Sequence, residues 1–287
     1  MRALLLAVFI PVVLLIGVLA SAVLGSDGEG GPAFARAIEP ALALGTEFVP
    51  PRAQRTDVGS GAQSAAIFQP EHGAGGPAPV VVFLHGWAAL DPARYGAWIG
   101  HLVDGGATVI YPAYQVRPAR NTITPLADAL AGVRAALADV QLEPGRLVVV
   151  GHSAGGALAA DYAAVAGPFG LPEPAAVLSV YPGRKLSYLP VPIPTVDLSV
   201  IPHRTRLVVL AGERDTAVGS GTAREIAAMA TKANVTYETV TDDTIDEHSA
   251  ARRDNPAARR TFWRTLDELI AATGPGGNDG DLRVSGR

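Results

Sequence analysis

Cysteine is absent from the 287-residue sequence. This absence excludes a thiol nucleophile, a metal centre with cysteine ligands and any disulfide bond. It leaves the redox state of the compartment open, because a chain without thiols is compatible with both reducing and oxidising surroundings.

Lysine is scarce, and no charge of one sign dominates. Lys185 and Lys232 are the only lysines, the formal net charge is −4, and the arginines are scattered along the chain. This pattern gives no basic surface of the kind that binds nucleic acid. The hydrophobic fraction of 48% is enough for a sizeable core, and the length fits one large α/β domain or two small ones.

The N-terminal segment, residues 1–24, departs from the composition of a soluble domain. After Arg2 the run from Ala3 to Leu24 carries no charge, and it reaches the roughly 20 residues that span a bilayer. With Arg2 on one side and acidic residues on the other, the positive-inside rule places the rest of the chain outside the cytoplasm. We expect a membrane anchor. Ala20-Ser21-Ala22 is compatible with cleavage, so secretion after removal of a signal peptide is the alternative, and a buried core helix is a weaker one.

Composition divides the remainder into three parts. Residues 25–59 are rich in glycine and proline at their start and are expected to be a linker that leads into the fold. Residues 60–272 form the predicted catalytic domain. Residues 273–287 are a glycine-rich polar tail that we expect to be disordered.

Apolar runs alternate with helical patterns through the central region. The predicted strands are Ser64–Gln69, Val80–Leu84, Ala107–Tyr111, Leu147–Val150, Ala176–Val180, Leu207–Ala211 and Val235–Val240. The predicted helices are Pro92–Leu102, Pro125–Val140, Ala154–Val165, Thr222–Lys232 and Pro256–Ala272. This alternation indicates an α/β fold with a mainly parallel sheet covered by helices on both faces. The segment between Tyr181 and Arg206 is too short and too rich in proline to form a large cap domain.

The sequence Gly151-His152-Ser153-Ala154-Gly155 lies between an apolar β-branched run and an alanine-rich helical pattern. Strand, sharp turn and helix are the context of a nucleophile elbow, in which the serine hydroxyl stands above the sheet edge. Glycine is needed at both ends because a Cβ would collide across so tight a turn. The alternative is a glycine-rich turn with a bystander serine.

A serine nucleophile needs a base, usually histidine oriented by a carboxylate. Among the six histidines, only His248 follows a strand late in the chain, which is where the order serine, acid, histidine requires the base. His152 belongs to the elbow itself, and the backbone direction there points its side chain away from Ser153. The alternative for His248 is a solvated loop histidine near a helix start.

The acid is expected after the Leu207–Ala211 strand. Asp215 is the first candidate and Glu213 the rival, with Arg214 expected to pair with Glu213 on the surface. A solvated turn aspartate is the alternative for Asp215. Three further aspartates follow the last strand and are interpreted as a polar loop: Asp242, Asp243 and Asp246.

An oxyanion needs two N–H donors. The backbone of Ala154 is expected to supply one, and the backbone of Trp87, after Gly86, the other. Tyr114 and Tyr181 are candidates to line an acyl pocket, with simple core packing as the alternative. An apolar rim in the proline-rich segment hints at an acyl or lipid-like group, or is a packed loop; it comprises Leu189, Val191, Ile193 and Val196.

With these residues in place, residues 60–272 resemble the α/β-hydrolase-fold serine esterases and lipases. The resemblance rests on His85-Gly86-Trp87, the elbow around Ser153, the Gly212–Val218 loop and His248. It implies a Ser153–Asp215–His248 triad, a covalent acyl-enzyme, and neither a metal nor an organic cofactor. Trp87 stands where the hormone-sensitive-lipase-like esterases continue with glycines. The chain is therefore more similar to small-lid or lidless members, such as dienelactone-hydrolase-like or cutinase-like enzymes, although it lacks the cysteine nucleophile of the former.

These observations predict a hydrolase of carboxylic esters whose substrate is a small-molecule or lipid-like ester. An acyltransferase, an amidase or a peptidase would use the same triad, and a non-catalytic binding protein on the same fold is a further alternative. The sequence leaves the natural ester and the oligomeric state undetermined.

Overall fold

The computed structural model describes residues 44–45, 47–72, 78–185 and 191–273. The predicted anchor or signal segment and the predicted tail from residue 274 onward lie outside the described residues. Within the described ranges no helix is both long and apolar enough to cross a membrane.

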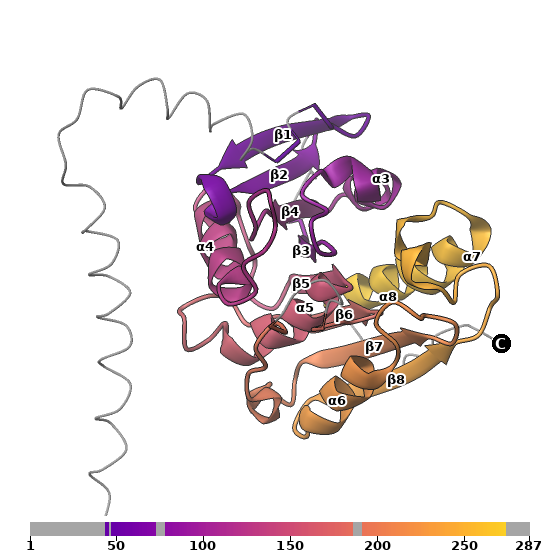
Figure 1. Ribbon diagram of the computed structural model, residues 1–287. Helices are drawn as coiled ribbons and strands as arrows, with labels where there is room; N and C mark the ends of the chain where they lie inside the picture. The colour runs from indigo at the N-terminus through magenta and orange to yellow at the C-terminus, as the bar shows by residue number, and fades with distance from the viewer. Residues whose placement is uncertain (1–43, 46, 73–77, 186–190, 274–287) are drawn as a thin grey trace, which may run out of the picture. The chain divides into compact units, whose positions relative to one another are not determined.

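Eight strands form one sheet. They are β1 (Ala53–Val58), β2 (Ala65–Pro70), β3 (Val80–Leu84), β4 (Thr108–Pro112), β5 (Leu147–His152), β6 (Ala176–Val180), β7 (Arg206–Gly212) and β8 (Asn234–Val240). Their order in the sheet is β1-β2-β4-β3-β5-β6-β7-β8, which Figure 1 shows from β1 at the top to β8 at the bottom. β2 pairs antiparallel with β1 and β4, and the pairs from β4 to β8 are parallel.

The helices are α3 (Gly96–Asp104), α4 (Pro125–Leu137), α5 (Ala154–Val165), α6 (Gly221–Met229), α7 (Pro256–Ala258) and α8 (Arg264–Ala272). A 3₁₀ turn, η2 (Pro92–Tyr95), leads into α3, and the predicted closing helix consists of α7, a π-helical turn (Arg259–Trp263) and α8. Shorter 3₁₀ turns occur at η1 (Gly61–Gln63), η3 (Leu198–Val200) and η4 (His248–Arg252).

Side-chain alternation along the central strands builds two hydrophobic layers. On β3, Val80, Val82 and Leu84 pack in the cluster that contains buried residues of α4, α5 and α6. Val81 and Phe83 pack in the cluster that contains residues of α3 and α8. Because both faces are covered, β3 is fully buried and entirely apolar. The predicted α/β class, with a mainly parallel sheet, helices on both faces and no large cap evident in the described residues, is confirmed.

One strand lies outside the predicted domain. β1 falls within the segment predicted to be a linker, and it pairs with β2 from Ala53 opposite Pro70 to Val58 opposite Ala65. It is an edge strand in which no residue is buried, so it carries no apolar pattern that would distinguish it from a linker. The sheet therefore begins before the predicted boundary at residue 60.

Candidate active site

Ser153 lies in a strained turn between β5 and α5. Its backbone has φ of 59° and ψ of −122°, a region that L-residues rarely occupy. Its N–H donates to the Val180 carbonyl over 3.0 Å, and its own carbonyl accepts from Gly183 N–H over 3.0 Å. A Cβ at Gly151 would overlap the Gly155 carbonyl, and one at Gly155 would overlap the Leu84 carbonyl. The strand–turn–helix geometry expected of an elbow is therefore present.

The structure brings Ser153, His248 and Asp215 together in one hydrogen-bonded line. His248 Nε2 lies 2.9 Å from Ser153 Oγ, and His248 Nδ1 lies 2.7 Å from Asp215 Oδ2. The Asp215 side chain is 0% exposed, whereas that of His248 is 21% exposed. The imidazole is thus oriented from a buried side by a carboxylate and remains open to a ligand on the other.

Asp215 is held by its own loop. Its Oδ1 accepts the backbone N–H groups of Ala217, over 3.0 Å, and Val218, over 3.1 Å. These two bonds leave Oδ2 for His248 and keep the carboxylate in one orientation. Glu213, the rival acid, is exposed, and no hydrogen bond joins its side chain to His248 in the described part of the chain.

Arg214 pairs with Asp246 and not with Glu213 as the sequence suggested. Its guanidinium makes a bidentate contact with the Asp246 carboxylate at 2.8 to 3.0 Å. The backbone N–H of Arg214 also donates to the Asp246 backbone carbonyl. Asp246 is 1% exposed, so its interpretation as part of a polar loop is wrong. A buried carboxylate needs such a partner. The hydrogen bond from Arg214 lowers the pKa of Asp246. The pair joins the loop of residues 213–218, which carries Asp215, to the loop of residues 241–248, which carries His248 and is called the base loop below.

The loop after β3, residues 85–89 (called here the oxyanion loop), is fixed by hydrogen bonds to its backbone. Gly86 N–H donates to Tyr95 Oη over 2.9 Å, and Ala88 N–H donates to Gln115 Oε1 over 2.8 Å. The His85 carbonyl accepts from the Tyr114 hydroxyl, and the Ala89 carbonyl accepts from the Tyr111 hydroxyl. Within the loop, the Gly86 carbonyl accepts from the Ala89 N–H. By contrast, the backbone N–H groups of Trp87 and Ala154 have no hydrogen-bond partner among the described residues.

The packing interpretation of Trp87 holds for its side chain, and the role of its backbone N–H as an oxyanion donor stays a prediction. Its side chain is buried at 8% exposure, and its indole N–H donates to the Ala119 carbonyl over 3.0 Å. The ring is therefore part of the packed structure while the backbone N–H stays available beside the elbow. Gln115 and Tyr95, which fix this loop, were not singled out from the sequence, because no motif marks a side chain that bonds a distant backbone group.

Tyr114 and Tyr181 lie in the core. Both are 1% exposed. Tyr114 stacks on His85 with ring centroids 4.2 Å apart, and the Tyr181 hydroxyl donates to the Ile245 carbonyl over 2.6 Å. These contacts favour the packing alternative for both residues over a lining of the acyl pocket.

The apolar rim is divided. Ile193 is buried at 2% exposure, whereas Val191 is 47% exposed. Val196 is half-buried, and Leu189 lies outside the described residues. Arg184, near the start of the proline-rich segment, forms a buried ion pair with Asp161 of α5 and also donates to the Pro194 carbonyl, which fastens the segment to the elbow helix.

The side chains of the histidines other than His248 make no hydrogen bond to Ser153 in the described residues. Burial lowers the pKa of His85 to about 4. His101 contacts Asp267 at 2.8 Å. His152 turns away from Ser153, as expected, toward Tyr95 and the His248 carbonyl. In the described ranges no group of three or more histidine or carboxylate side chains could hold a metal ion.

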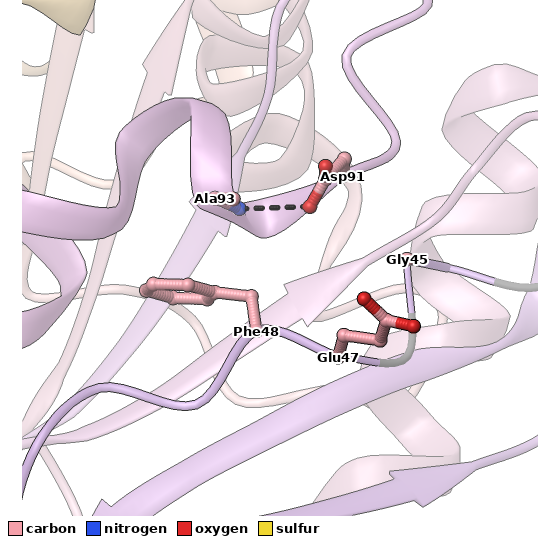
Figure 2. Close-up of a pocket in the computed structure, with 5 residues that line it drawn as sticks. All are labelled: Gly45, Glu47, Phe48, Asp91 and Ala93. Atoms are coloured by element: carbon pink, nitrogen blue, oxygen red, sulfur yellow. Dashed lines mark hydrogen bonds between the residues drawn. The ribbon is translucent and has the colours of Figure 1, made fainter.

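The described residues also form a pocket of about 500 Å³, whose lining residues Figure 2 shows. It is lined by Gly45, Glu47, Phe48, Asp91 and Ala93. Asp91 Oδ1 accepts the Ala93 N–H over 3.0 Å and caps the 3₁₀ turn η2. No member of the Ser153–His248–Asp215 line contributes to this pocket.

Comparison with known proteins supports the fold. A family model described as alpha/beta hydrolase fold matches residues 81–200, whereas no curated protein matches the sequence. An esterase from Rhizomucor miehei is 18% identical, with a TM-score of 0.60, over 90% of this chain and 97% of its own. A thermostable esterase from Pseudomonas putida is 19% identical, with a TM-score of 0.59, over 90% and 95%.

A putative dienelactone hydrolase from Klebsiella pneumoniae is 18% identical, with a TM-score of 0.56, over 76% of this chain and 98% of its own. At these identities the likeness concerns the fold. Together with the family match it confirms the resemblance inferred from the sequence: this chain has the α/β-hydrolase fold that the esterases and lipases share.

Proposed function

We propose that the protein is a serine hydrolase that cleaves carboxylic esters through Ser153, His248 and Asp215. The observation that carries the proposal is the unbroken line of contacts from Ser153 Oγ to His248 at 2.9 Å and from His248 to Asp215 at 2.7 Å. The solved esterases of the same fold support ester cleavage as the reaction.

In the proposed reaction His248 Nε2 takes the proton of the Ser153 hydroxyl as Oγ attacks the ester carbonyl. Asp215 keeps the proton on Nδ1, so that Nε2 is free to accept, and it stabilises the imidazolium that forms. The backbone N–H groups of Trp87 and Ala154 donate to the developing oxyanion, and the start of α5 adds the positive end of its helix dipole.

Collapse of the tetrahedral intermediate breaks the bond to the alkoxy group, which leaves as an alcohol with the proton from His248. A water molecule then loses a proton to His248 and attacks the acyl group on Ser153. The second intermediate releases the carboxylic acid and returns the proton to Ser153 Oγ. The residues present account for every proton, so the cycle needs no additional group.

The membrane assignment remains a proposal from composition. The uncharged run between Ala3 and Leu24 is long enough to anchor the hydrolase domain to a membrane, with the domain outside the cytoplasm. Fractionation of expressing cells, with alkaline extraction of membranes, tests it: the anchored protein stays with the membranes, whereas a cleaved and secreted form is found in the medium.

A fluorophosphonate probe tests the proposed nucleophile. An activated serine displaces fluoride and forms a covalent phosphonyl adduct that adds one defined mass to the protein. We expect one adduct on the wild-type protein and none on Ser153→Ala. Ser220→Ala is a matched control because it removes a hydroxyl at the start of α6, far along the chain from the elbow, and it should still be labelled. A well-folded wild-type protein without an adduct would refute the proposal.

Product analysis separates hydrolysis from acyl transfer. Incubation with a soluble ester should release the free acid, and added alcohol or amine should divert little of the acyl group. A product formed mainly on the alcohol or amine would instead identify an acyltransferase. Ester binding that survives Ser153→Ala, with no turnover by the wild type, would identify a binding protein.

A further inference from the structure

A buried network connects the oxyanion loop to the base. Tyr95 Oη lies 2.9 Å from Gly86 N and 2.9 Å from His152 Nδ1. His152 Nε2 lies 2.8 Å from the backbone carbonyl oxygen of His248. Tyr95 is 2% exposed and His152 0%. Three contacts, of which the first two are buried and the third is part-buried, therefore run from the loop after β3 to His248.

The partners determine where each proton lies. The His248 carbonyl can only accept, so His152 Nε2 must carry a hydrogen. In a neutral imidazole Nδ1 is then the acceptor, and the Tyr95 hydroxyl donates to it. Gly86 N–H can only donate, and Tyr95 Oη accepts it with a lone pair. One neutral tautomer of His152 thus satisfies all three contacts at once.

The surroundings keep His152 in this neutral form. Burial is the main cause that lowers the pKa of His152 well below 6.5, and the neighbouring His248 and Arg252 side chains lower it further. The Arg252 guanidinium lies 6.0 Å from the centre of the Tyr95 ring. A proton on Nδ1 would also remove the acceptor that the Tyr95 hydroxyl uses.

Gly86 marks the point where these groups converge. A Cβ at position 86 would lie 3.1 Å from Tyr95 Oη, 3.2 Å from His152 Nδ1 and 3.4 Å from Arg252 Nη2. Side chains in such contacts would have to shift by a few tenths of an ångström. The glycine of the His85-Gly86-Trp87 sequence therefore leaves room for Tyr95 and His152 close to the backbone.

We propose that Tyr95 and His152 are positioning residues that hold the oxyanion loop and the base loop at a fixed distance on either side of Ser153. This inference rests on the proposed function, in which Trp87 of the oxyanion loop donates to the oxyanion and His248 of the base loop is the base. In the sheet the two loops are separated, because three strands, β5, β6 and β7, lie between β3 and β8. His152, at the end of β5, bridges this gap directly.

Tyr95→Phe in the full-length protein tests the link because it removes the hydroxyl and keeps the ring. The ring packs on Phe83 with the two ring centroids 5.0 Å apart. With p-nitrophenyl acetate as probe, we expect kcat to fall roughly 10- to 100-fold, the range for a displacement of reacting groups by about 1 Å. KM should change little because neither residue contacts the ester. Tyr162→Phe is the matched control: it removes another buried hydroxyl, which donates to the Pro172 carbonyl, and should keep the wild-type kcat.

A pair of variants at position 152 tests the same link independently of Tyr95. His152→Gln retains a donor toward the His248 carbonyl and an acceptor toward Tyr95, whereas His152→Phe retains neither. We expect the glutamine variant to have a kcat about tenfold or more above that of the phenylalanine variant. Equal kcat values for the two would overturn the proposal, including in the case that Tyr95→Phe fails to fold.

The tautomer of His152 is measurable without any activity. Nitrogen NMR of histidine-labelled protein distinguishes a protonated from an unprotonated ring nitrogen, and the signals lost in His152→Phe assign the residue. We expect hydrogen on Nε2 alone; hydrogen on Nδ1 would overturn the proposal. A wild-type protein inert to esters and to fluorophosphonate would refute the proposed function instead, and an active wild type with an equally active Tyr95→Phe variant would refute only this inference.

Discussion

Replacement of Asp215 by asparagine provides the sharpest test of the acid. Asp215 Oδ1 accepts two backbone N–H groups at 3.0 and 3.1 Å, and Oδ2 lies 2.7 Å from His248 Nδ1. An asparagine would keep its oxygen on the two N–H donors and turn its NH₂ group toward His248. Nδ1 must then accept, so the hydrogen moves to Nε2, and His248 can no longer take the proton of Ser153.

The structure sets the size of this effect. The two backbone bonds contribute about 0.5 to 1.5 kcal/mol each, so together they favour the inactivating amide orientation by about 1 to 3 kcal/mol. The charge that stabilises the imidazolium is lost as well. Combining the wrong tautomer with the lost charge, we expect kcat to fall about 10⁴-fold, equivalent to about 5.5 kcal/mol in the barrier.

The assay is the initial rate on a soluble p-nitrophenyl ester at saturating concentration, beside Glu213→Gln. Both changes remove one negative charge from the same loop, but only Asp215 contacts His248. Glu213→Gln should retain most of the activity. If Asp215→Asn kept more than about a tenth of the wild-type kcat, where the tautomer argument requires a loss near 10⁴-fold, or if Glu213→Gln were the inactive variant, the assignment of the acid would be wrong.

Three further predictions concern stability. Because Ser153 has φ of 59°, Ser153→Gly should unfold at a higher denaturant concentration than Ser153→Ala, with a free energy of unfolding that is higher by up to about 1 kcal/mol; the reverse order would argue against strain at the elbow. Arg184→Met leaves the fully buried Asp161 carboxylate unpaired and should cost about 3 to 5 kcal/mol, most of which returns when Asp161→Leu is added; a double variant as unstable as the single one would contradict this. The hydrogen bond to Asp267 raises the pKa of His101 above 6.5. The stabilisation by this ion pair is therefore complete below pH 6.5 and is lost as the pH rises through the raised pKa. Urea unfolding should therefore show His101→Gln destabilised near pH 5.5 and close to wild type near pH 9; an equal loss at both pH values would exclude the ion pair as its cause.

The central sheet was predictable because strands that are buried on both faces have nearly continuous apolar sequences. β3 and β6 were predicted with their observed bounds, since each is a short and mainly apolar run that is fully buried. β1 was not, because an edge strand exposed on its surface needs no apolar side chains. Its pairing with β2 comes from backbone bonds, which any sequence without proline can make.

The site was predictable only as far as topology determines it. The carboxyl ends of parallel strands meet at one edge of a sheet, so Ser153, Asp215 and His248 could be placed together from their positions after β5, β7 and β8. The contacts that fix these groups could not. Arg214 reaches Asp246 and not its neighbour Glu213, since the buried carboxylate has the greater need of a cation.

The hydrogen bonds around the oxyanion loop explain why such contacts matter beyond stability. A donor lowers a barrier most when it already points at the charge that forms, since it then spends no energy on turning. Ala88, beside Trp87, has φ of 59°, a conformation that persists only where the surroundings impose it. Gln115 imposes it from one side and Tyr95, through Gly86, from the other. The strain in this loop and the strain at Ser153 thus each hold a group that the proposed reaction uses: the Trp87 N–H, which has no hydrogen-bond partner among the described residues, and the Ser153 hydroxyl.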